Sequence, residues 1–333
     1  MEQQNMLARQ LFEKIKSKAE TPIRFKQRSC LRRRFNKNDC RACLNECQAG
    51  ALELDGRTLS FDAEKCTGCM RCEAVCPNDA FTADLDMLQF FKDVQSQKLT
   101  VLSCRKKEQF VSYQKIHCIG ALSDPLLAAM NSLAKGEIFL DTTQCVSCAN
   151  GHCLEKIKRS LDTLRTQNIT PDKTLSIKLV PDEASFPEVD NKTSRRFFLK
   201  GTGRAIADFG IETCGKALQS NDTKKQDPTK GPVKNSVFLQ FAFDNTADEE
   251  ERKTLKSFFY TIQTDEKCNL CPICSGMCPT GALKRVNENG EKHLVFKSSD
   301  CSGCGLCRDF CKKQALSISQ GFTGDTREAI QIN

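Results

Sequence analysis

The sequence predicts an α+β protein in which two small cysteine-rich modules flank a small parallel α/β domain, with linkers between them. Cysteines recur at short, regular intervals near both ends of the chain, and strand and helix patterns alternate in the middle. The length of 333 residues suits about two or three domains. We expect an N-terminal helix within 1–27, a first module at 28–85, the α/β domain at 86–166, a linker with a helix at 193–218 over 167–235, and a second module at 236–333.

The N-terminal segment has a helical pattern over residues 5–19, with Met6, Leu7, Leu11, Phe12 and Ile15 on one side. The chain starts without an apolar leader, and no stretch reaches the roughly 20 apolar residues that span a bilayer. We therefore expect a cytoplasmic protein without a transmembrane segment.

Four groups of four cysteines account for sixteen of the 22 cysteines. Two groups have the spacing C-x2-C-x2-C-x3-C followed by proline, and a third has the same spacing without proline. These three are Cys66, Cys69, Cys72, Cys76; Cys268, Cys271, Cys274, Cys278; and Cys301, Cys304, Cys307, Cys311. The fourth group is looser, Cys30, Cys40, Cys43 and Cys47, because Lys37 occupies the position where regular spacing would place its first cysteine.

These groups resemble the bacterial two-cluster ferredoxin family over residues 28–84 and 264–320. In that family, three cysteines of one motif and the last cysteine of the other hold each [4Fe-4S] cluster. The resemblance implies two ferredoxin-like modules and four such clusters. Their ligand sets would be Cys66, Cys69, Cys72 with Cys47; Cys30, Cys40, Cys43 with Cys76; Cys268, Cys271, Cys274 with Cys311; and Cys301, Cys304, Cys307 with Cys278.

Proline is missing after two of the groups, where Gln48 and Lys312 stand instead. Since proline there mainly fixes φ and removes an N–H, its loss is compatible with a cluster. Zinc is the main alternative, but structural zinc sites rarely use a third cysteine at the next interval. A disulfide scaffold would normally be small and secreted.

The formal net charge of +8 counts every cysteine as neutral. Four clusters with four thiolates each would bring about −2 apiece and cancel that charge, so we expect no nucleic-acid partner. Basic residues do gather near the first group, at Arg24, Lys26, Arg28 and residues 32–34. They either balance cluster charge or dock an acidic redox partner.

The middle of the chain alternates between strand and helix patterns, which indicates a parallel sheet. We expect a helix at Asp86–Gln95, strands at Leu99–Ser103, Lys115–His117 and Glu137–Leu140, and a helix at Leu154–Leu164. Another helix should begin with Asp124 as N-cap and Pro125 as first residue, and end at Gly136.

Five cysteines follow these strands, and loops at the carboxyl ends of parallel strands converge on one edge. We favour Cys104, Cys118, Cys145 and Cys153 as ligands of a fifth iron–sulfur cluster, with Cys148 as a substitute. Zinc, free thiols or a redox disulfide are the alternatives, and Cys153 is the best candidate for a reactive thiol. His117 and His152 either ligate or pack beside the site.

This middle region resembles the small iron–sulfur subunit that links hydrogenase to heterodisulfide reductase in methanogens. The features that carry the resemblance are the strand that ends at Cys104, residues 117–122, the Leu-rich helix after them, and residues 144–153. It implies a fifth iron–sulfur site that bridges to a larger oxidoreductase.

Residues 167–192 and 219–235 have linker composition, with one strand expected at Leu175–Val180. Between them, residues 194–200 resemble a twin-arginine export motif, but the following sequence is too polar for a leader. A packing helix is the better interpretation, with Cys214 as an ordinary thiol.

The sequence thus predicts an electron-transfer protein that relays low-potential electrons between redox partner proteins or oxidoreductase subunits, in anaerobic metabolism. It contains no nucleotide-binding glycine loop and no nucleophile motif. The alternatives are a thiol- or disulfide-active enzyme that uses the central cysteines, and a redox-sensing accessory protein.

Overall fold

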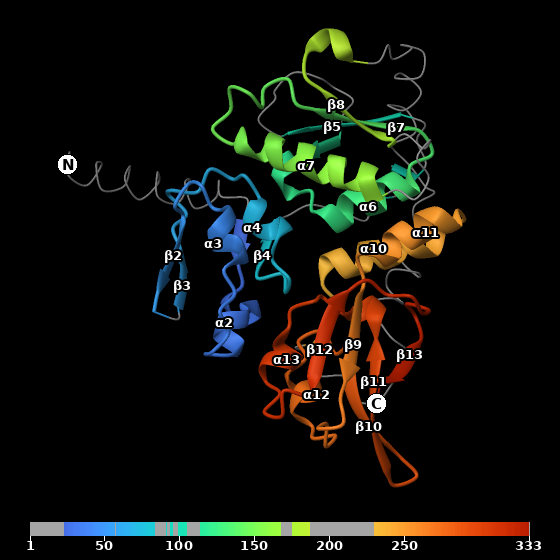
Figure 1. Cartoon of the computed structure of the whole chain (residues 1–333). Coiled ribbons are helices and arrows are strands. Elements are labelled where there is room, and N and C mark those ends of the chain that lie inside the picture. The colour runs from blue at the N-terminus through green and yellow to red at the C-terminus, as the bar shows by residue number, and fades with distance from the viewer. Residues whose placement is uncertain are drawn as a thin grey trace, which may run out of the picture.

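The computed structural model describes residues 23–56, 58–83, 91, 94–95, 99–104, 114–167, 175–186 and 230–332. The expected helices at 5–19 and 193–218, the twin-arginine segment and Cys214 lie outside these residues. Of the expected helix at Asp86–Gln95, residues 91, 94 and 95 are described and are helical. The described residues form two cysteine-rich modules, a central sheet with its helices, and two helices that connect them (Figure 1).

The first module repeats a simple plan of strand, cysteine loop and hairpin. Its elements are β1 (Ile23–Phe25), η1 (Gln27–Ser29), α2 (Leu31–Arg34), α3 (Ala42–Glu46), β2 (Leu52–Asp55), β3 (Thr58–Phe61), α4 (Arg71–Ala74) and β4 (Phe81–Ala83). β1 pairs antiparallel with β4, and β2 with β3. The outer strands therefore close the module around its two cysteine loops.

The C-terminal module has the same plan with one added strand. Its elements are β9 (Tyr260–Thr264), α12 (Ile273–Met277), β10 (Leu283–Glu288), β11 (Glu291–Lys297), η4 (Ser298–Asp300), α13 (Leu306–Asp309), β12 (Leu316–Gln320) and β13 (Ala329–Ile332). β9 pairs with β12, and β11 lies between β10 and β13, all antiparallel. This module has its own core around Leu294 and Phe296, both fully buried.

All four cysteine groups end in the same backbone turn. The third residue after the last cysteine has a positive φ in each case: Gly50 (63°), Asp79 (46°), Gly281 (75°) and Gln314 (53°). The turn forms after Cys47 and Cys311, where proline is missing, as well as after the two prolines. The proline is therefore not needed for this local geometry.

The central domain is a four-stranded parallel sheet in the order β6–β5–β7–β8. Its elements are β5 (Leu99–Cys104), β6 (Gln114–Ile116), η2 (Ile119–Ala121), α6 (Asp124–Leu133), β7 (Glu137–Asp141), α7 (His152–Gln167), β8 (Ile177–Val180) and η3 (Glu183–Ser185). The predicted parallel sheet is thus confirmed. β8, which we expected in the linker, pairs with β7, so the sheet continues past residue 166.

The N-cap of α6 differs from the prediction. Ser123 is the N-cap, and its hydroxyl accepts a hydrogen bond from the Leu126 N–H at 3.4 Å. Asp124 and Pro125 are therefore the first two helical residues rather than the cap and first residue. Proline is tolerated there because the first N–H groups of a helix have no partner within the helix.

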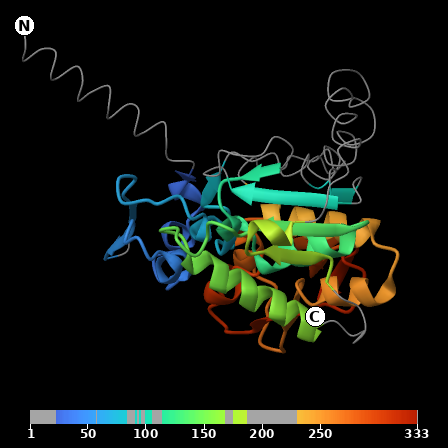
Figure 2. The ribbon, with the colours of Figure 1, turned by 90° about the horizontal axis from the view of Figure 1, so that it is seen from above.

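Two helices that the sequence analysis did not predict join the modules: α10 (Lys234–Asn245) and α11 (Glu249–Lys256). They lie between α6 and the C-terminal module (Figures 1 and 2). Phe238 and Leu239 of α10 belong to the same core as Leu127 and Met130 of α6 and Phe81 of the first module. The central domain and the first module therefore share one hydrophobic core with these helices.

Candidate iron–sulfur sites

The cysteines of each ferredoxin-like module come together as two mixed sets, each with the last cysteine of the other group. We number four sets along the molecule: set I (Cys268, Cys271, Cys274, Cys311), set II (Cys278, Cys301, Cys304, Cys307), set III (Cys30, Cys40, Cys43, Cys76) and set IV (Cys47, Cys66, Cys69, Cys72). All members of set II line one small cavity, and all members of set III line another. In set I, the charges of Cys271, Cys268 and Cys311 lie close enough to Cys274 to raise its pKa. In set IV, Cys69 and Cys47 affect Cys66 in the same way.

Burial raises the pKa of several of these thiols, so that they stay protonated at neutral pH unless a positive charge is bound. It raises the pKa of Cys43 to about 12, with further contributions from Cys76, Cys40 and Cys30. Burial likewise raises the pKa of Cys274 to about 11 and of Cys307 to about 12. Four partly or fully buried thiols that would repel one another as anions need a cationic centre to become thiolates.

Backbone N–H groups also point at the sulfurs. Ala80 donates to the Cys76 Sγ at 3.2 Å, and Ala315 donates to the Cys311 Sγ at 3.4 Å. Both donors lie four residues after the cysteine, just beyond the shared turn. Hydrogen bonds of this kind are among the features that tune iron–sulfur centres. The donor sets, burial and hydrogen bonds of sets I to IV therefore fit iron–sulfur clusters.

A larger cavity of about 320 Å³ lies at the carboxyl edge of the central sheet. Four cysteines line it, and we call them set V: Cys104, Cys118, Cys145 and Cys148. Burial raises the pKa of Cys145 to about 12, and Cys118, Cys104 and Cys148 raise it further. These cysteines meet because β5, β6 and β7 run parallel and end at the same edge.

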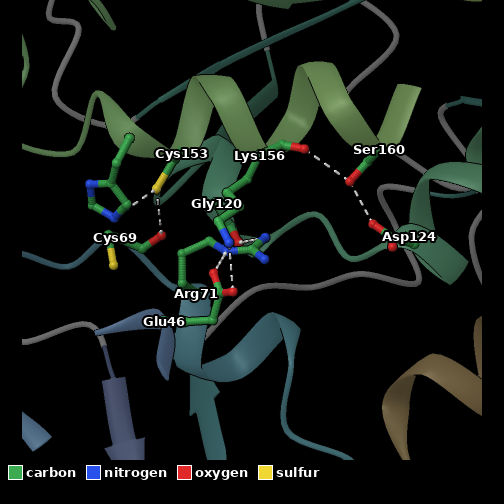
Figure 3. Close-up of polar contacts among 9 residues, drawn as sticks. Glu46, Cys69, Arg71, Gly120, Asp124, Cys153, Lys156 and Ser160 are labelled. Atoms are coloured by element: carbon green, nitrogen blue, oxygen red, sulfur yellow. Dashed lines mark hydrogen bonds and ion pairs between the residues drawn. The ribbon is translucent and has the colours of Figure 1, made fainter. Parts of the chain in front are cut away.

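Cys153, which we favoured as a ligand, does not line this cavity, whereas Cys148 does. Cys153 is buried in the first turn of α7, beside the first module (Figure 3). Its Sγ lies 3.7 Å from the Cys69 carbonyl oxygen and 3.6 Å from His152 Nε2. His117 lines the cavity itself, so the two histidines occupy different places.

A partly buried ion-pair network fixes the first module against the central domain (Figure 3). Glu46 accepts from Arg71 Nε and from Lys156 Nζ, both at 2.9 Å. Arg71 also donates to the Gly120 carbonyl oxygen at 3.5 Å. Burial opposes ionisation of Glu46, but the hydrogen bonds from Lys156 and Arg71 outweigh it and lower the pKa of that carboxyl.

The two ferredoxin-like modules also touch each other. Asn38 Nδ2 of the first module donates to Asp309 of the C-terminal module at 2.9 Å. Lys234, at the start of the connecting helix α10, donates its N–H to Asp79 and its Nζ to Glu73, both at 2.6 Å. A cavity of about 60 Å³ lies between the modules, and Cys76, Cys301 and Tyr260 are among the residues around it. Sequence reasoning missed Tyr260, whose ring covers the loop at Gly303 so closely that a Cβ there would lie 2.1 Å from it.

Two residues outside the cysteine sets have structural roles. His293 lies 3.6 Å from Glu288 on the hairpin of β10 and β11. In the basic segment, Arg32 donates through Nε to the Cys40 carbonyl oxygen at 2.6 Å. That bond ties α2 to the loop that carries Cys40 and Cys43.

Comparison with known proteins identifies both cysteine-rich modules. The model of the 4Fe-4S dicluster domain matches residues 38–80 and 267–315. Among curated proteins, the chain is 38% identical over 63 residues to the polyferredoxin protein MvhB of Methanothermobacter marburgensis, covering 16% of this chain and 15% of that protein. It is 34% identical over 58 residues to the ferredoxin-type protein NapH of Haemophilus influenzae, covering 17% of this chain and 20% of that protein.

A third relative is pyruvate synthase subunit PorD of Thermotoga maritima, 40% identical over 53 residues, covering 16% of this chain and half of that protein. The chain therefore spans half or less of the length of these relatives. No solved structure matches it significantly. Among the described residues, no helix has the length and apolar character to span a membrane. The matched segments and their cysteine sets show that the chain carries two ferredoxin-type 4Fe-4S dicluster domains, one on each side of a central parallel sheet.

Proposed function

We propose that the protein carries electrons along a row of five iron–sulfur sites, from set I through sets II, III and IV to set V. Iron–sulfur clusters, when bound, supply one-electron carriers at low potential. The cysteines of sets I to IV would each hold one [4Fe-4S] cluster, with the crossed ligands described above. Cys104, Cys118, Cys145 and Cys148 would hold the fifth.

The observation that supports this proposal best is that each cysteine set lies close to the next one. Within the modules, Cys274 of set I raises the pKa of Cys307 in set II, and Cys43 of set III raises that of Cys72 in set IV, in both cases after the larger effect of burial. Neighbouring sets in one module are thus within electrostatic reach of each other.

The row also crosses from one ferredoxin-like module to the other and from the first module to the central domain. Sets II and III face each other across the 60 Å³ cavity that Cys301 and Cys76 border. Sets IV and V approach each other at Cys153, whose Sγ donates to the Cys69 carbonyl oxygen at 3.7 Å and which also interacts with Cys118. Each set therefore lies next to the following one, with no further domain between them. This supports a single row of five sites.

The ends of the row indicate where partners would dock. Set I lies at the far end of the C-terminal module, with the exposed Lys267, Lys312 and Lys313 next to its cysteines. Set V lies at an edge of the central sheet. The names of the relatives, a polyferredoxin, a ferredoxin-type protein and a pyruvate synthase subunit, support redox proteins or oxidoreductase subunits as donor and acceptor. A cytoplasmic location belongs to this proposal, because assembly of such sites needs reduced thiols.

One observation favours a second function, an enzyme whose active site is set V. The central cavity measures about 320 Å³, against about 20 and 10 Å³ at sets III and II. That space, lined also by His117, Asp141 and Asn150, would admit a small molecule beside the thiols. Electrons delivered along the row would then reduce that molecule instead of a partner protein.

Iron and acid-labile sulfide per chain, measured on protein purified without oxygen, test the proposal. We expect about twenty iron atoms, or about eighteen if set V holds a two-iron cluster. About sixteen would leave set V as zinc or thiols and remove it from the row. Little iron with bound zinc would refute the electron-transfer function. A change of the set V signal by a small thiol, measured by EPR, would favour the enzyme.

A further inference from the structure

The segment that carries three cysteines of set III is strongly basic. Residues 26–43, which we call the basic loop, contain seven lysines and arginines and a single acidic residue, Asp39. Cys30, Cys40 and Cys43 of set III all lie on it. Five of its basic side chains are exposed to solvent: Lys26, Arg28, Arg33, Lys37 and Arg41.

Most of these exposed cations have no carboxylate partner, unlike exposed lysines elsewhere in the molecule. Lys65 pairs with Glu53 at 2.9 Å, and Lys158 pairs with Glu155 at 2.8 Å. Within the ranges that the structure describes, no carboxylate forms an ion pair with four cations of the basic loop: Arg28, Arg33, Lys37 and Arg41. Their positive charge is therefore not compensated by the described part of the chain.

Balancing the charge of a bound cluster explains only part of this excess. A [4Fe-4S] cluster with four thiolates carries about −2. Arg32 and Arg34 are half-buried, and Arg32 lines the cavity of set III, so these two already offset a charge of that size. The cysteine loops of sets II and IV have no such excess: residues 298–311 contain one arginine and two aspartates, and residues 62–76 contain two basic and three acidic residues. The exposed cations are therefore available to bind an anionic partner.

The basic loop is tied down at two places. Arg32 Nε donates to the Cys40 carbonyl oxygen at 2.6 Å, which closes the loop on itself. Phe35 packs against Phe310 of the C-terminal module, with the ring centroids 4.0 Å apart, and α2 lies beside α13 (Figure 1). The cations thus stand on a backbone that is already held in place before any partner binds.

The exposed cations also lie next to set III. Arg28 precedes Cys30 by two residues, and Arg41 directly follows Cys40. Arg33, although exposed, borders the same small cavity as Cys30. A partner that contacts these side chains would lie beside set III, with no other domain between.

We propose that the exposed cations of the basic loop dock an acidic electron-carrier protein directly over set III. This inference rests on the proposed function and adds a third docking place to the two ends of the row. The partner would exchange one electron with set III: one side is oxidised as the other is reduced, and no bond or proton is transferred. Because set III is the third of five sites, electrons that enter there can leave toward either end of the row.

The chemistry of the loop favours a protein over other polyanions. Complementary charge speeds the encounter of two proteins and orients them. Single-stranded nucleic acids also need aromatic side chains on which their bases stack, but Phe35, the one aromatic residue of the loop, packs against Phe310. Membrane-surface segments also insert apolar side chains, and residues 26–43, all of them described, expose no large hydrophobic residue.

The test uses the iron-loaded full chain and, as the probe, a small acidic [2Fe-2S] ferredoxin that is reduced before mixing. Arg28→Glu with Lys37→Glu reverses two charges of the loop. The control, Lys284→Glu with Lys292→Glu, makes the same change of charge at two exposed lysines of the hairpin of β10 and β11. Iron and sulfide content are measured first. The rate constant of electron transfer from the probe is then measured by stopped-flow absorbance at low and at high salt.

We expect full iron in all three proteins. At low ionic strength the loop variant should accept electrons at least about tenfold more slowly than the unchanged protein, and the control should stay within about twofold, since electrostatic steering changes association rates by about 10–10³. The difference should vanish near 1 M salt, where the Debye length is about 3 Å. Equal slowing in the loop variant and the control, or no slowing in either, would overturn the inference.

Cross-linking of the unchanged protein locates the contact without any substitution, so it decides the question even if the loop variant fails to fold. A carbodiimide joins lysines to carboxylates that touch them. We expect cross-links from the probe to Lys26 and Lys37, whereas cross-links only to Lys267, Lys312 and Lys313 beside set I would contradict the inference.

Two further results separate the remaining explanations. If duplex DNA or vesicles of phosphatidylglycerol bound the loop as tightly as the probe does, the loop would be a general polyanion site and the inference would be wrong. Low iron in the unchanged protein would refute the proposed function, and this inference with it. Full iron without the expected rates and cross-links would refute this inference alone.

Discussion

Gly120→Ala should destabilise the junction between the first module and the central domain. The added methyl group would lie 2.2 Å from the Cys69 carbonyl oxygen and 2.7 Å from the Cys153 Sγ. One obstacle is backbone and the other is a side chain that is 1% exposed, so neither can move cheaply. Overpacking a closed site costs about 1–3 kcal/mol, and this site belongs at the upper end. A loss of about 3 kcal/mol would lower the melting temperature by roughly 6–12 °C.

The assay is thermal unfolding of the iron-loaded protein, followed by circular dichroism without oxygen at a fixed heating rate. Gly231→Ala is the control, since a Cβ there meets no atom within 4 Å. It should change stability by less than about 0.5 kcal/mol. If Gly120→Ala melted at the same temperature as the control, the close approach of the two domains at Gly120 would be wrong.

Three further predictions concern the sites and the network between them. Cys278→Ser should remove the cluster of set II and leave that of set I, as seen by EPR; loss of set I alone would refute the crossed ligands. Glu46→Gln should cost about 1–3 kcal/mol in chemical unfolding, because Arg71 and Lys156 lose a charged partner in a place where Glu46 is only 16% exposed. The control Glu53→Gln, which breaks an exposed pair, should cost about 0.5 kcal/mol or less, and equal costs would contradict a special role for Glu46. Removal of iron by oxidation and chelation should unfold both ferredoxin-like modules first, since metal sites supply much of the cohesion of small domains. Hydrogen exchange should then show β7 of the central sheet still protected, and equal loss everywhere would argue against this order.

The cysteine loops were predictable because their geometry is local. Three cysteines at intervals of three residues fit on one short loop, and the spacing alone distinguishes them from a zinc site. The loop around Cys40 and Cys43 lacks both the regular first cysteine and the proline, yet its turn at Gly50 matches the other three.

The helices α10 and α11 were missed although the sequence contains a signal for α11. Asp248 caps it by accepting from the N–H groups of Glu250 and Glu251, and three glutamates fill its first turn. α10 has a weaker signal, because it is apolar on several sides. It packs against α6 and also contacts the C-terminal module, where Ser236 donates to the Cys301 carbonyl oxygen at 3.0 Å.

The sequence by itself predicted the ferredoxin-like modules and the parallel direction of the central strands, and the resemblance to two-cluster ferredoxins implied the crossed pairing of the cysteine groups. The modules and the strand direction follow from spacing and periodicity, which depend on neighbouring residues. Only the tertiary structure distinguished Cys148 from Cys153 and brought neighbouring cysteine sets close to one another. The physical reason is that both depend on contacts between residues far apart in the chain: α7 starts against the first module, so its first-turn thiol meets Cys69, while the loop before it leaves Cys148 in the central cavity.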